Sequence, residues 1–298
     1  MDGLGNQMFQ YAFGRYIQTV YKEPIVFETM KLNESSVRRV GIHNCNIPIV
    51  EKHPGAEQCR FAGSAENAVL QGISKGVRIA AEKIFGIPMT GSDSYSKMIK
   101  YGYYTTTDSL AYYPFEKTTA KTKFVRGYFQ SEKYFEPISS TIKDELKIVR
   151  GLTQKAIEQA EIMKNQQSVC VHIRRGDYIG HKRYDVCGYD YYKNAFELMN
   201  IKIPNSVYYI FSNSEKDLEW IKNNYKFSVK VNYVTQGKSE FDDLYMMYNC
   251  KNHIISNSTF GWWASFLCDN TDNITIAPQQ WVKTDEQQDI LRDKWICI

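Results

Sequence analysis

The second half of the chain alternates between short apolar runs and amphipathic stretches. Five runs rich in β-branched and aromatic residues predict buried strands, at residues 169–173, 207–211, 229–234, 253–256 and 274–277. Between them, apolar residues recur at helical spacing and predict helices at 191–199, 215–223, 240–248 and 259–267. This alternation is typical of an α/β fold with a parallel sheet and helices on both faces. Ligands bind at the carboxyl ends of the strands in such sheets.

The first half is less regular. Apolar residues from Phe9 to Val20 keep a helical period behind the turn Gly3-Leu4-Gly5, and residues 25–27 and 124–125 predict strands. Residues 55–115 give no clear assignment. A further helix is expected at 153–164, followed by a hinge. We therefore expect two domains, residues 1–165 and 166–298.

Charge and cysteine usage narrow the class of protein. The chain has 298 residues and a net charge of +4, which suits a phosphate-bearing ligand or peripheral attachment to an anionic membrane and requires no nucleic acid. Its seven cysteines include no C-x-x-C pair, so neither a disulfide framework nor a zinc site is indicated. No apolar run approaches membrane-spanning length, and no basic stretch followed by an apolar segment opens the sequence. We expect a cytoplasmic protein.

A cationic motif follows the first apolar run of the second half. Residues 172–177 read His172-Ile173-Arg174-Arg175-Gly176-Asp177. The planar guanidinium group of arginine donates two parallel hydrogen bonds to phosphate oxygens, so this pattern favours a diphosphate site over an arginine pair that serves only solubility.

Two other polar segments are expected at the same edge of the sheet. Asn213 ends the second run, and the fourth run is followed by Ser256, Asn257, Ser258, Thr259 and Phe260. Ser258 is a good N-cap for a helix starting at Thr259, and helix N-termini attract anions. Two questions stay open: whether Ser258 contacts phosphate besides capping, and whether His172 binds the base or is a hydrogen-bonded core histidine. Asn213 is a candidate for ribose or base contact.

The ordered motifs resemble those of the α-1,2-fucosyltransferases, glycosyltransferase family 11, of bacterial type. The resemblance is carried by His172 to Tyr178, by Gly3-Leu-Gly-Asn-Gln-Met-Phe-Gln-Tyr-Ala12 and by Ser256 to Ala264. Gly127 to Ser131 and the run from Asp243 to Met247 lie where similar family blocks are expected. The similarity spans nearly the whole chain.

The resemblance implies a GT-B-like architecture, in which two Rossmann-like domains face each other across a cleft. Residues 1–165 would then be the acceptor side and residues 166–298 the donor side. The implied reaction is inverting transfer of L-fucose from GDP-fucose to the 2-hydroxyl of a β-galactoside, in surface glycan (O-antigen) biosynthesis. Another fucose linkage, or a nucleotide- or glycan-binding module without turnover, is the alternative.

The resemblance also implies roles for individual residues. Gly3, Gly5, Asn6 and Gln7 would form a loop that approaches the donor diphosphate. The family carries an apolar strand before this loop, whereas the present sequence has Met1-Asp2 there. Asp243 matches a position that contacts guanine, which a carboxylate recognises by accepting from two donors of the base. The alternative for Asp243 is a solvent-facing helix acid.

The catalytic groups follow from the charge that the reaction develops. The sequence contains no Asp-x-Asp, so we expect neither a metal ion nor another cofactor, with Arg174 neutralising the leaving diphosphate. Asp177 is the candidate general base, since inversion needs a group that accepts the acceptor's proton. The competing interpretation pairs Asp177 with Arg175 to hold the loop.

Overall fold

The computed structural model describes residues 3–29, 40–84, 86, 92–106, 110–235 and 237–298. The chain forms an α/β fold with two compact units, Met1–Leu146 with Glu286–Ile290 and Lys147–Asp285 with Leu291–Ile298. The units therefore divide after Leu146. Helix α6 (Gln154–Asn165), which the sequence placed at the end of the first domain, packs on the second unit. The assignment of acceptor and donor sides to residues 1–165 and 166–298 stays a prediction.

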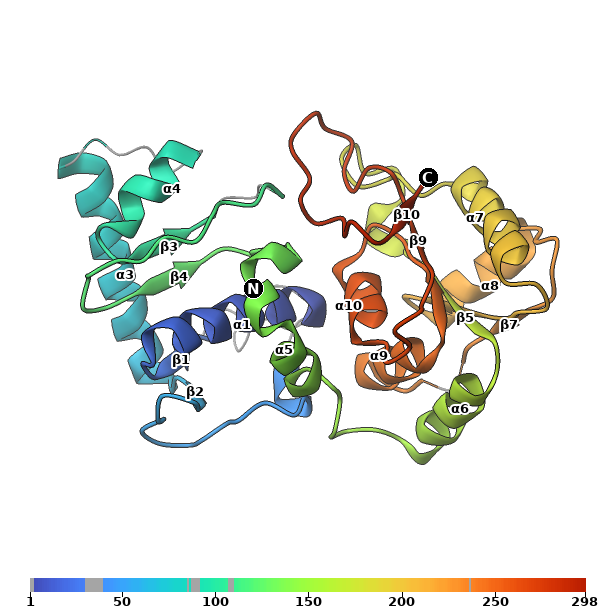
Figure 1. The fold of residues 1–298 in the computed structure, drawn as a ribbon, viewed down its shortest axis with the longest axis horizontal. Coiled ribbons are helices and arrows are strands. Elements are labelled where there is room, and N and C mark those ends of the chain that lie inside the picture. The colour runs from blue at the N-terminus through green and yellow to red at the C-terminus, as the bar shows by residue number, and fades with distance from the viewer. Residues whose placement is uncertain (1–2, 30–39, 85, 87–91, 107–109, 236) are drawn as a thin grey trace. The chain divides into compact units, whose positions relative to one another are not determined.

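A six-stranded parallel sheet forms the centre of the second unit (Figure 1). Its strands, in spatial order, are β7 (Val231–Tyr233), β6 (Val207–Ser212), β5 (Ser168–Ile173), β8 (Asn252–Ile254), β9 (Thr275–Ala277) and β10 (Ile296–Cys297). This is the 3-2-1-4-5-6 order of Rossmann folds. The five predicted strands are confirmed, and the two-residue β10 is an addition.

Helices cover both faces of this sheet, as predicted. On one face α7 (Tyr189–Lys202) and α8 (Glu215–Asn224) pack on the fully buried Val169, Val171 and Ile210. The other face carries α6, α9 (Glu240–Asn249) and α10 (Thr259–Leu267), and α9 contacts both of the others (Figure 1). Trp262 and Trp263 on α10 are completely buried, so both belong to the core.

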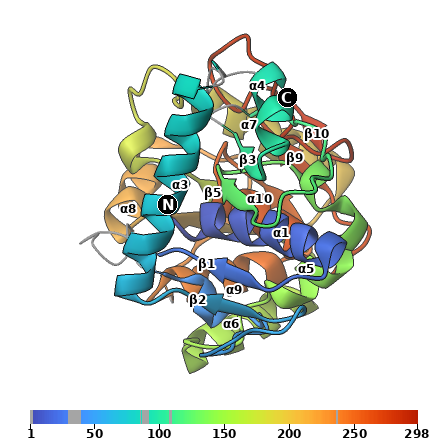
Figure 2. The same cartoon turned by 90° about the vertical axis from the view of Figure 1, so that its left-hand side faces the viewer.

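The first unit contains two small parallel sheets. One pairs β1 (Ile25–Phe27) with β2 (Cys59–Phe61), and the other pairs β3 (Tyr103–Thr105) with β4 (Phe124–Arg126). Figure 2 shows α1 (Leu4–Tyr21) and α3 (Ser64–Ile84) beside them. The other elements are η1 (Ile42–Asn44), α4 (Ser92–Ile99), η2 (Glu132–Tyr134), η3 (Glu136–Ile138) and α5 (Ser139–Glu145). The predicted first helix and the strands at 25–27 and 124–125 are confirmed.

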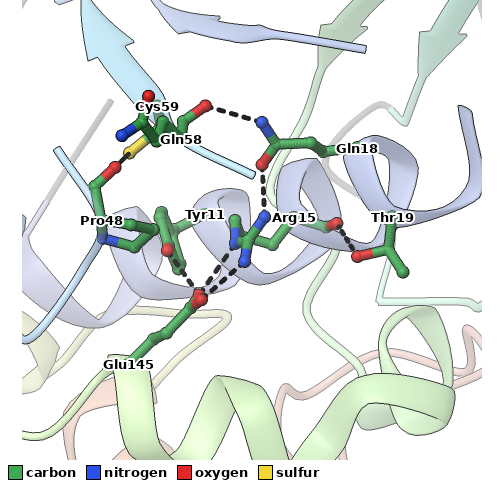
Figure 3. Close-up of polar contacts among 8 residues, drawn as sticks. All are labelled: Tyr11, Arg15, Gln18, Thr19, Pro48, Gln58, Cys59 and Glu145. Atoms are coloured by element: carbon green, nitrogen blue, oxygen red, sulfur yellow. Dashed lines mark hydrogen bonds and ion pairs between the residues drawn. The ribbon is translucent and has the colours of Figure 1, made fainter. Parts of the chain in front are cut away.

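A buried ion pair ties α1 to α5 in the first unit (Figure 3). Arg15 donates from Nε to Oε2 of Glu145 at 2.9 Å and from Nη2 to Oε1 at 2.6 Å, and the Tyr11 hydroxyl also donates to Oε2. Such a pair is costly to break on one side, because the remaining charge is left buried. The cluster therefore fixes the helix whose first turn carries Gly5, Asn6 and Gln7.

Candidate active site

The second unit gathers polar side chains where its strand order reverses. In a 3-2-1-4-5-6 sheet this switch point lies between the first and fourth strands, here β5 and β8. Arg174 follows β5 and Ser256 follows β8, while Asn213 follows the neighbouring β6. Because all these strands are parallel, their carboxyl ends meet at one edge, as the sequence predicts.

Arg174 is held by the loop that follows it. Its Nη2 donates to Oδ1 of Asp177 at 2.6 Å, and its guanidinium group lies 5.0 Å from the ring centroid of Tyr178. Gly176 allows this turn because its φ of 57° is in the left-handed region that favours glycine. The Arg174 side chain is 20% exposed and its Nε is buried without a hydrogen-bond partner among the described residues. Contact of Arg174 with a donor diphosphate stays a prediction.

The alternative that pairs Asp177 with Arg175 is wrong, because Arg175 turns toward α8. Its guanidinium group lies 3.2 Å from the centroid of the Trp220 ring, and its Nε is 3.6 Å from Oδ1 of Asp217. Its backbone N–H donates to Oδ1 of Asn213 at 3.1 Å. The two adjacent arginines thus differ in their contacts: Arg175 anchors the loop to α8, whereas Arg174 pairs with Asp177 within the loop.

This anchoring is testable at Trp220, which is 40% exposed and contacts Arg175 through its ring face. A cation–π contact of this kind contributes about 0.5–2 kcal/mol. We expect Trp220→Ala to raise the donor KM roughly threefold to tenfold, since the Arg174 loop must then be ordered on binding. Trp220→Phe retains a ring face and is the control that should stay near wild type. Equal kinetics for the Ala and Phe variants would contradict the anchoring role.

His172 is a buried neutral histidine beside the N-terminus of α10. Burial, helped by the charge of Arg174, lowers the pKa of its ring to about 3. The hydroxyl of Ser256 lies 3.2 Å from its Nδ1. A Cβ at Gly261 would lie 2.8 Å from the same atom, so only glycine lets α10 approach the ring this closely. His172 therefore adds no charge at neutral pH, and its contact with a base stays a prediction.

The segment before α10 combines structural and ligand-accessible positions. Ser258 is the N-cap of α10, as predicted, and its side chain accepts from the backbone N–H of Phe260. Asn257 is 2% exposed, and its amide donates to the carbonyls of Tyr184 and Trp281 at 2.8 and 2.9 Å. The Asn257 side chain thus holds neighbouring loops. Thr259 and Phe260 are half-buried and open the helix, where its N-terminus favours an anion.

Asp243 lies in the first turn of α9 and is half-buried, so the alternative of a solvent-facing acid is wrong. A Cβ at Gly237 would collide with its carboxylate. Burial, with the neighbouring Asp242, raises the pKa of Asp243 to about 7. Asp242 has a structural role, since it accepts from the backbone N–H and the hydroxyl of Thr153 at 2.8 and 3.0 Å. Within the described residues, no hydrogen-bond donor faces the Asp243 carboxylate.

The glycine loop belongs to the first unit. Gly3 is the N-cap of α1, and Gly5 is buried. Oδ1 of Asn6 accepts from Nε2 of Gln130 at 2.8 Å, and Oε1 of Gln7 accepts from the backbone N–H of Gly41 at 2.9 Å. These contacts hold the first turn of α1. Contact of Gly3, Gly5, Asn6 and Gln7 with a donor stays a prediction.

Sequence reasoning missed the residues that position the site. Asp217 and Trp220 reach Arg175 only through the packing of α8, which no local pattern encodes, and the Ser256–Ala264 motif does not by itself indicate that Gly261 lies against His172. In the described part of the chain, no group of three His, Cys, Asp or Glu side chains is arranged to hold a metal ion. No described helix is both long and apolar enough to cross a membrane.

A Rossmann-type sheet with a guanidinium group at its switch point defines a nucleotide-binding α/β protein. The family model of glycosyl transferase family 11 matches residues 2–298, and the chain belongs to this family. It is therefore a glycosyltransferase, with a nucleotide-sugar donor and a glycan acceptor.

Three relatives are similar over most of the chain. An alpha-1,2-colitosyltransferase of Escherichia coli is 28% identical, with 99% of this chain and 96% of that protein covered. The O-antigen biosynthesis glycosyltransferase WbnK of Escherichia coli is 26% identical, with 99% and 98% covered. A galactoside 2-alpha-L-fucosyltransferase of Caenorhabditis elegans is 26% identical, with 71% and 61% covered.

Proposed function

We propose that the protein transfers L-fucose from GDP-fucose to the 2-hydroxyl of a β-galactoside in surface glycan biosynthesis, with inversion at the anomeric carbon. The observation that carries this proposal is Arg174, a partly open guanidinium group at the switch point of the sheet, two residues after His172, which lies beside the first turn of α10. Cations and helix N-termini stabilise the charge that develops on a departing diphosphate.

The chemistry is a single displacement. The acceptor oxygen forms a bond to the anomeric carbon while the bond from that carbon to the diphosphate oxygen breaks, and the acceptor's proton passes to a base. Arg174 stabilises the released GDP. The carboxylate of Asp177 is 62% exposed and pairs with Arg174, so holding Arg174 is its first role, and acting as the base is the alternative.

The guanine preference rests on Asp243. An ionised carboxylate accepts from both N1–H and the exocyclic amine of guanine, whereas adenine and uracil do not present this pair of donors. The half-buried position of Asp243, free of donors from the described residues, suits this contact. Fucose as the donor sugar is supported by the name of the Caenorhabditis elegans relative, and the α-1,2 linkage by that name together with the name of the alpha-1,2-colitosyltransferase.

A second candidate donor sugar is colitose, which lacks one hydroxyl of L-fucose. It is supported by the Escherichia coli relative named as an alpha-1,2-colitosyltransferase, which covers 99% of this chain. A site that hydrogen-bonds the hydroxyl present only in L-fucose would discriminate strongly against colitose. With colitose bound, the protein group that binds this hydroxyl would be left without a partner.

A donor and acceptor panel tests the proposal. GDP release is measured from GDP-fucose, GDP-colitose and GDP-mannose, each with lactose, N-acetyllactosamine or galactosyl-N-acetylgalactosamine and without acceptor. We expect the fastest release from GDP-fucose with a galactoside. Faster release from GDP-colitose would make colitose the donor sugar, and no acceptor-dependent release from any donor would overturn the proposed reaction.

We further propose that transfer needs no metal ion, since Arg174 supplies the positive charge that a divalent cation provides elsewhere. Treatment with EDTA is expected to leave at least about half of the initial rate, because chelation removes no group that contacts the diphosphate. The rate is measured as formation of the fucosylated product. This readout is used because a divalent ion added back after EDTA can bind released GDP and would disturb an assay of GDP. Complete loss that only a divalent ion restores would contradict this.

A further inference from the structure

The connection from β5 to α7, residues 174–188, continues beyond the motif that ends at Tyr178. Two further rings of this connection pack next to Tyr178. The ring of Tyr184 stacks on that of Tyr178, with centroids 5.3 Å apart and an angle of 25° between the planes. The ring of His181 lies 4.7 Å from that of Tyr184. Stacked rings stabilise one another beyond the area that they bury, so Tyr184 restrains Tyr178.

Tyr178 links these rings to the candidate active site. The guanidinium group of Arg174 lies 5.0 Å from the centroid of the Tyr178 ring, within the range of a cation–π contact. Burial raises the pKa of the Tyr178 hydroxyl to about 12, so the ring meets Arg174 as a neutral phenol. The contact therefore depends on where the ring lies, and Tyr184 helps to fix that position.

Hydrogen bonds give the connection a defined shape around Tyr184. The backbone N–H of His181 donates to the carbonyl of Tyr178 at 3.1 Å, and that of Tyr184 donates to the carbonyl of His181 at 3.2 Å. The carboxylate of Asp185 accepts from the backbone N–H of Gly180 at 3.1 Å. The chain therefore turns back on itself, which brings the ring of Tyr184 against that of Tyr178.

The far end of the connection is tied to the segment before α10. The Asn257 amide donates to the carbonyl of Tyr184 at 2.8 Å, and its Oδ1 accepts from the Cys187 thiol at 3.5 Å. The carbonyl of Arg183 accepts from the backbone N–H of Lys283 at 2.9 Å. Buried polar contacts of this kind are costly to leave unmade. The backbone of Tyr184 is therefore held from outside the connection.

We propose that Tyr184 is a positioning residue for sugar transfer, which holds Arg174 through the ring of Tyr178; this inference rests on the role proposed above for Arg174. The connection then has two anchors, because Arg175 fixes it to α8 and Tyr184 fixes it to the segment before α10. Arg174 pairs with Asp177 between these anchors. A preorganised cation stabilises developing charge without moving during the reaction, so Tyr184 affects turnover although it lies outside the motif.

A double-mutant cycle with Arg174 separates positioning from a purely structural role. The rate of product formation at saturating donor is measured for the wild type, Tyr184→Ala, Arg174→Ala and the double variant. We expect Tyr184→Ala to lower this rate roughly fivefold to thirtyfold when Arg174 is present, and less than about twofold when residue 174 is alanine. Tyr184→Phe keeps the ring and is the matched control, which should stay within about twofold of the wild type.

An equal loss in both backgrounds would mean that Tyr184 supports only the fold, and it would overturn the inference. A wild-type rate for Tyr184→Ala would overturn it as well. If Tyr184→Ala does not fold, Tyr184→Leu takes its place in the cycle, because leucine fills much of the same space without offering a ring face.

Calorimetry with GDP repeats the cycle without sugar transfer, so its outcome does not depend on which sugar or acceptor the enzyme uses. Tyr184→Ala should weaken GDP binding roughly threefold to tenfold when Arg174 is present and leave it unchanged when residue 174 is alanine. This coupling in a protein that does not transfer fucose would contradict the proposed reaction and support the role of Tyr184. Fucose transfer without the coupling would contradict only the role of Tyr184.

Discussion

Replacing Arg174 with alanine is expected to lower turnover on the order of a hundredfold or more, because one preorganised donor to a developing anion contributes about that much. Arg174→Lys should recover only a little, since lysine keeps the charge but loses the planar fork. The Arg174 side chain contacts Asp177 and Tyr178 of its own loop, so its removal should leave the sheet and its helices intact. Initial rates at saturating donor check this, and a wild-type rate for Arg174→Ala would remove Arg174 from the mechanism.

Asp177→Asn separates two roles for the carboxylate that pairs with Arg174 at 2.6 Å. A positioning role predicts that GDP affinity and turnover fall together, because Arg174 loses its support. A base role predicts unchanged GDP affinity with turnover lower by about a hundredfold. Near-normal turnover would exclude Asp177 from both roles.

The second large effect is expected at Asp243. Asp243→Asn should weaken binding of GDP-fucose about tenfold to a hundredfold, because a charged acceptor for two guanine donors is lost. In the wild type the affinity should fall as the pH drops below about 7, where the carboxyl of Asp243 takes up a proton. Calorimetry with GDP-fucose measures this, since its diphosphate has no terminal phosphate that titrates in the same range.

The free energy of unfolding should change with pH in the opposite direction to the affinity for GDP-fucose. Burial and Asp242 raise the pKa of this carboxyl from 3.8 to about 7, so the folded state binds the proton more tightly than the unfolded state. The wild type therefore loses stability as the pH rises from about 4 to 7. Asp243→Asn should have a higher Tm at pH 8, and this difference should shrink at pH 5. Equal affinity of the wild type for GDP and UDP, or an unchanged Tm at both pH values, would contradict the assignment.

The second unit was the more predictable part of the fold, for physical reasons. Strand β5 is buried along its whole length, and four of its six residues are apolar and lie on both faces of the sheet: Val169, Cys170, Val171 and Ile173. Ser214, Ser239 and Ser258 cap α8, α9 and α10, so the helix starts are visible in the sequence. Strand β10 has only two residues and leaves no pattern.

The region that gave no assignment, residues 55–115, contains β2, α3, α4 and β3. Within α3, Gly72 and Gly76 interrupt the helical pattern, and the apolar Val69 and Ile73 are 60% and 49% exposed. Sequence analysis detects a helix when its apolar residues fall on one buried face. In α3 some apolar residues face solvent, so the pattern does not stand out.

The candidate site was predictable where chemistry follows a strand directly, as for His172 and Arg174. Its supporting contacts were not, because they join residues that are distant in sequence. The sequence around Arg175 does not indicate that its side chain contacts Trp220. Nor does the sequence around Asp242 and Asp243 indicate which of the two binds Thr153. Adjacent residues with identical side chains acquire different roles only through tertiary packing.

The central claim is tested most directly by the structure of the product. After reaction of GDP-β-L-fucose with lactose, NMR of the purified trisaccharide gives both the anomeric configuration and the linked carbon. The account predicts an α-fucosyl residue on O2 of galactose. A β-linked product, or fucose on any other hydroxyl, would contradict it.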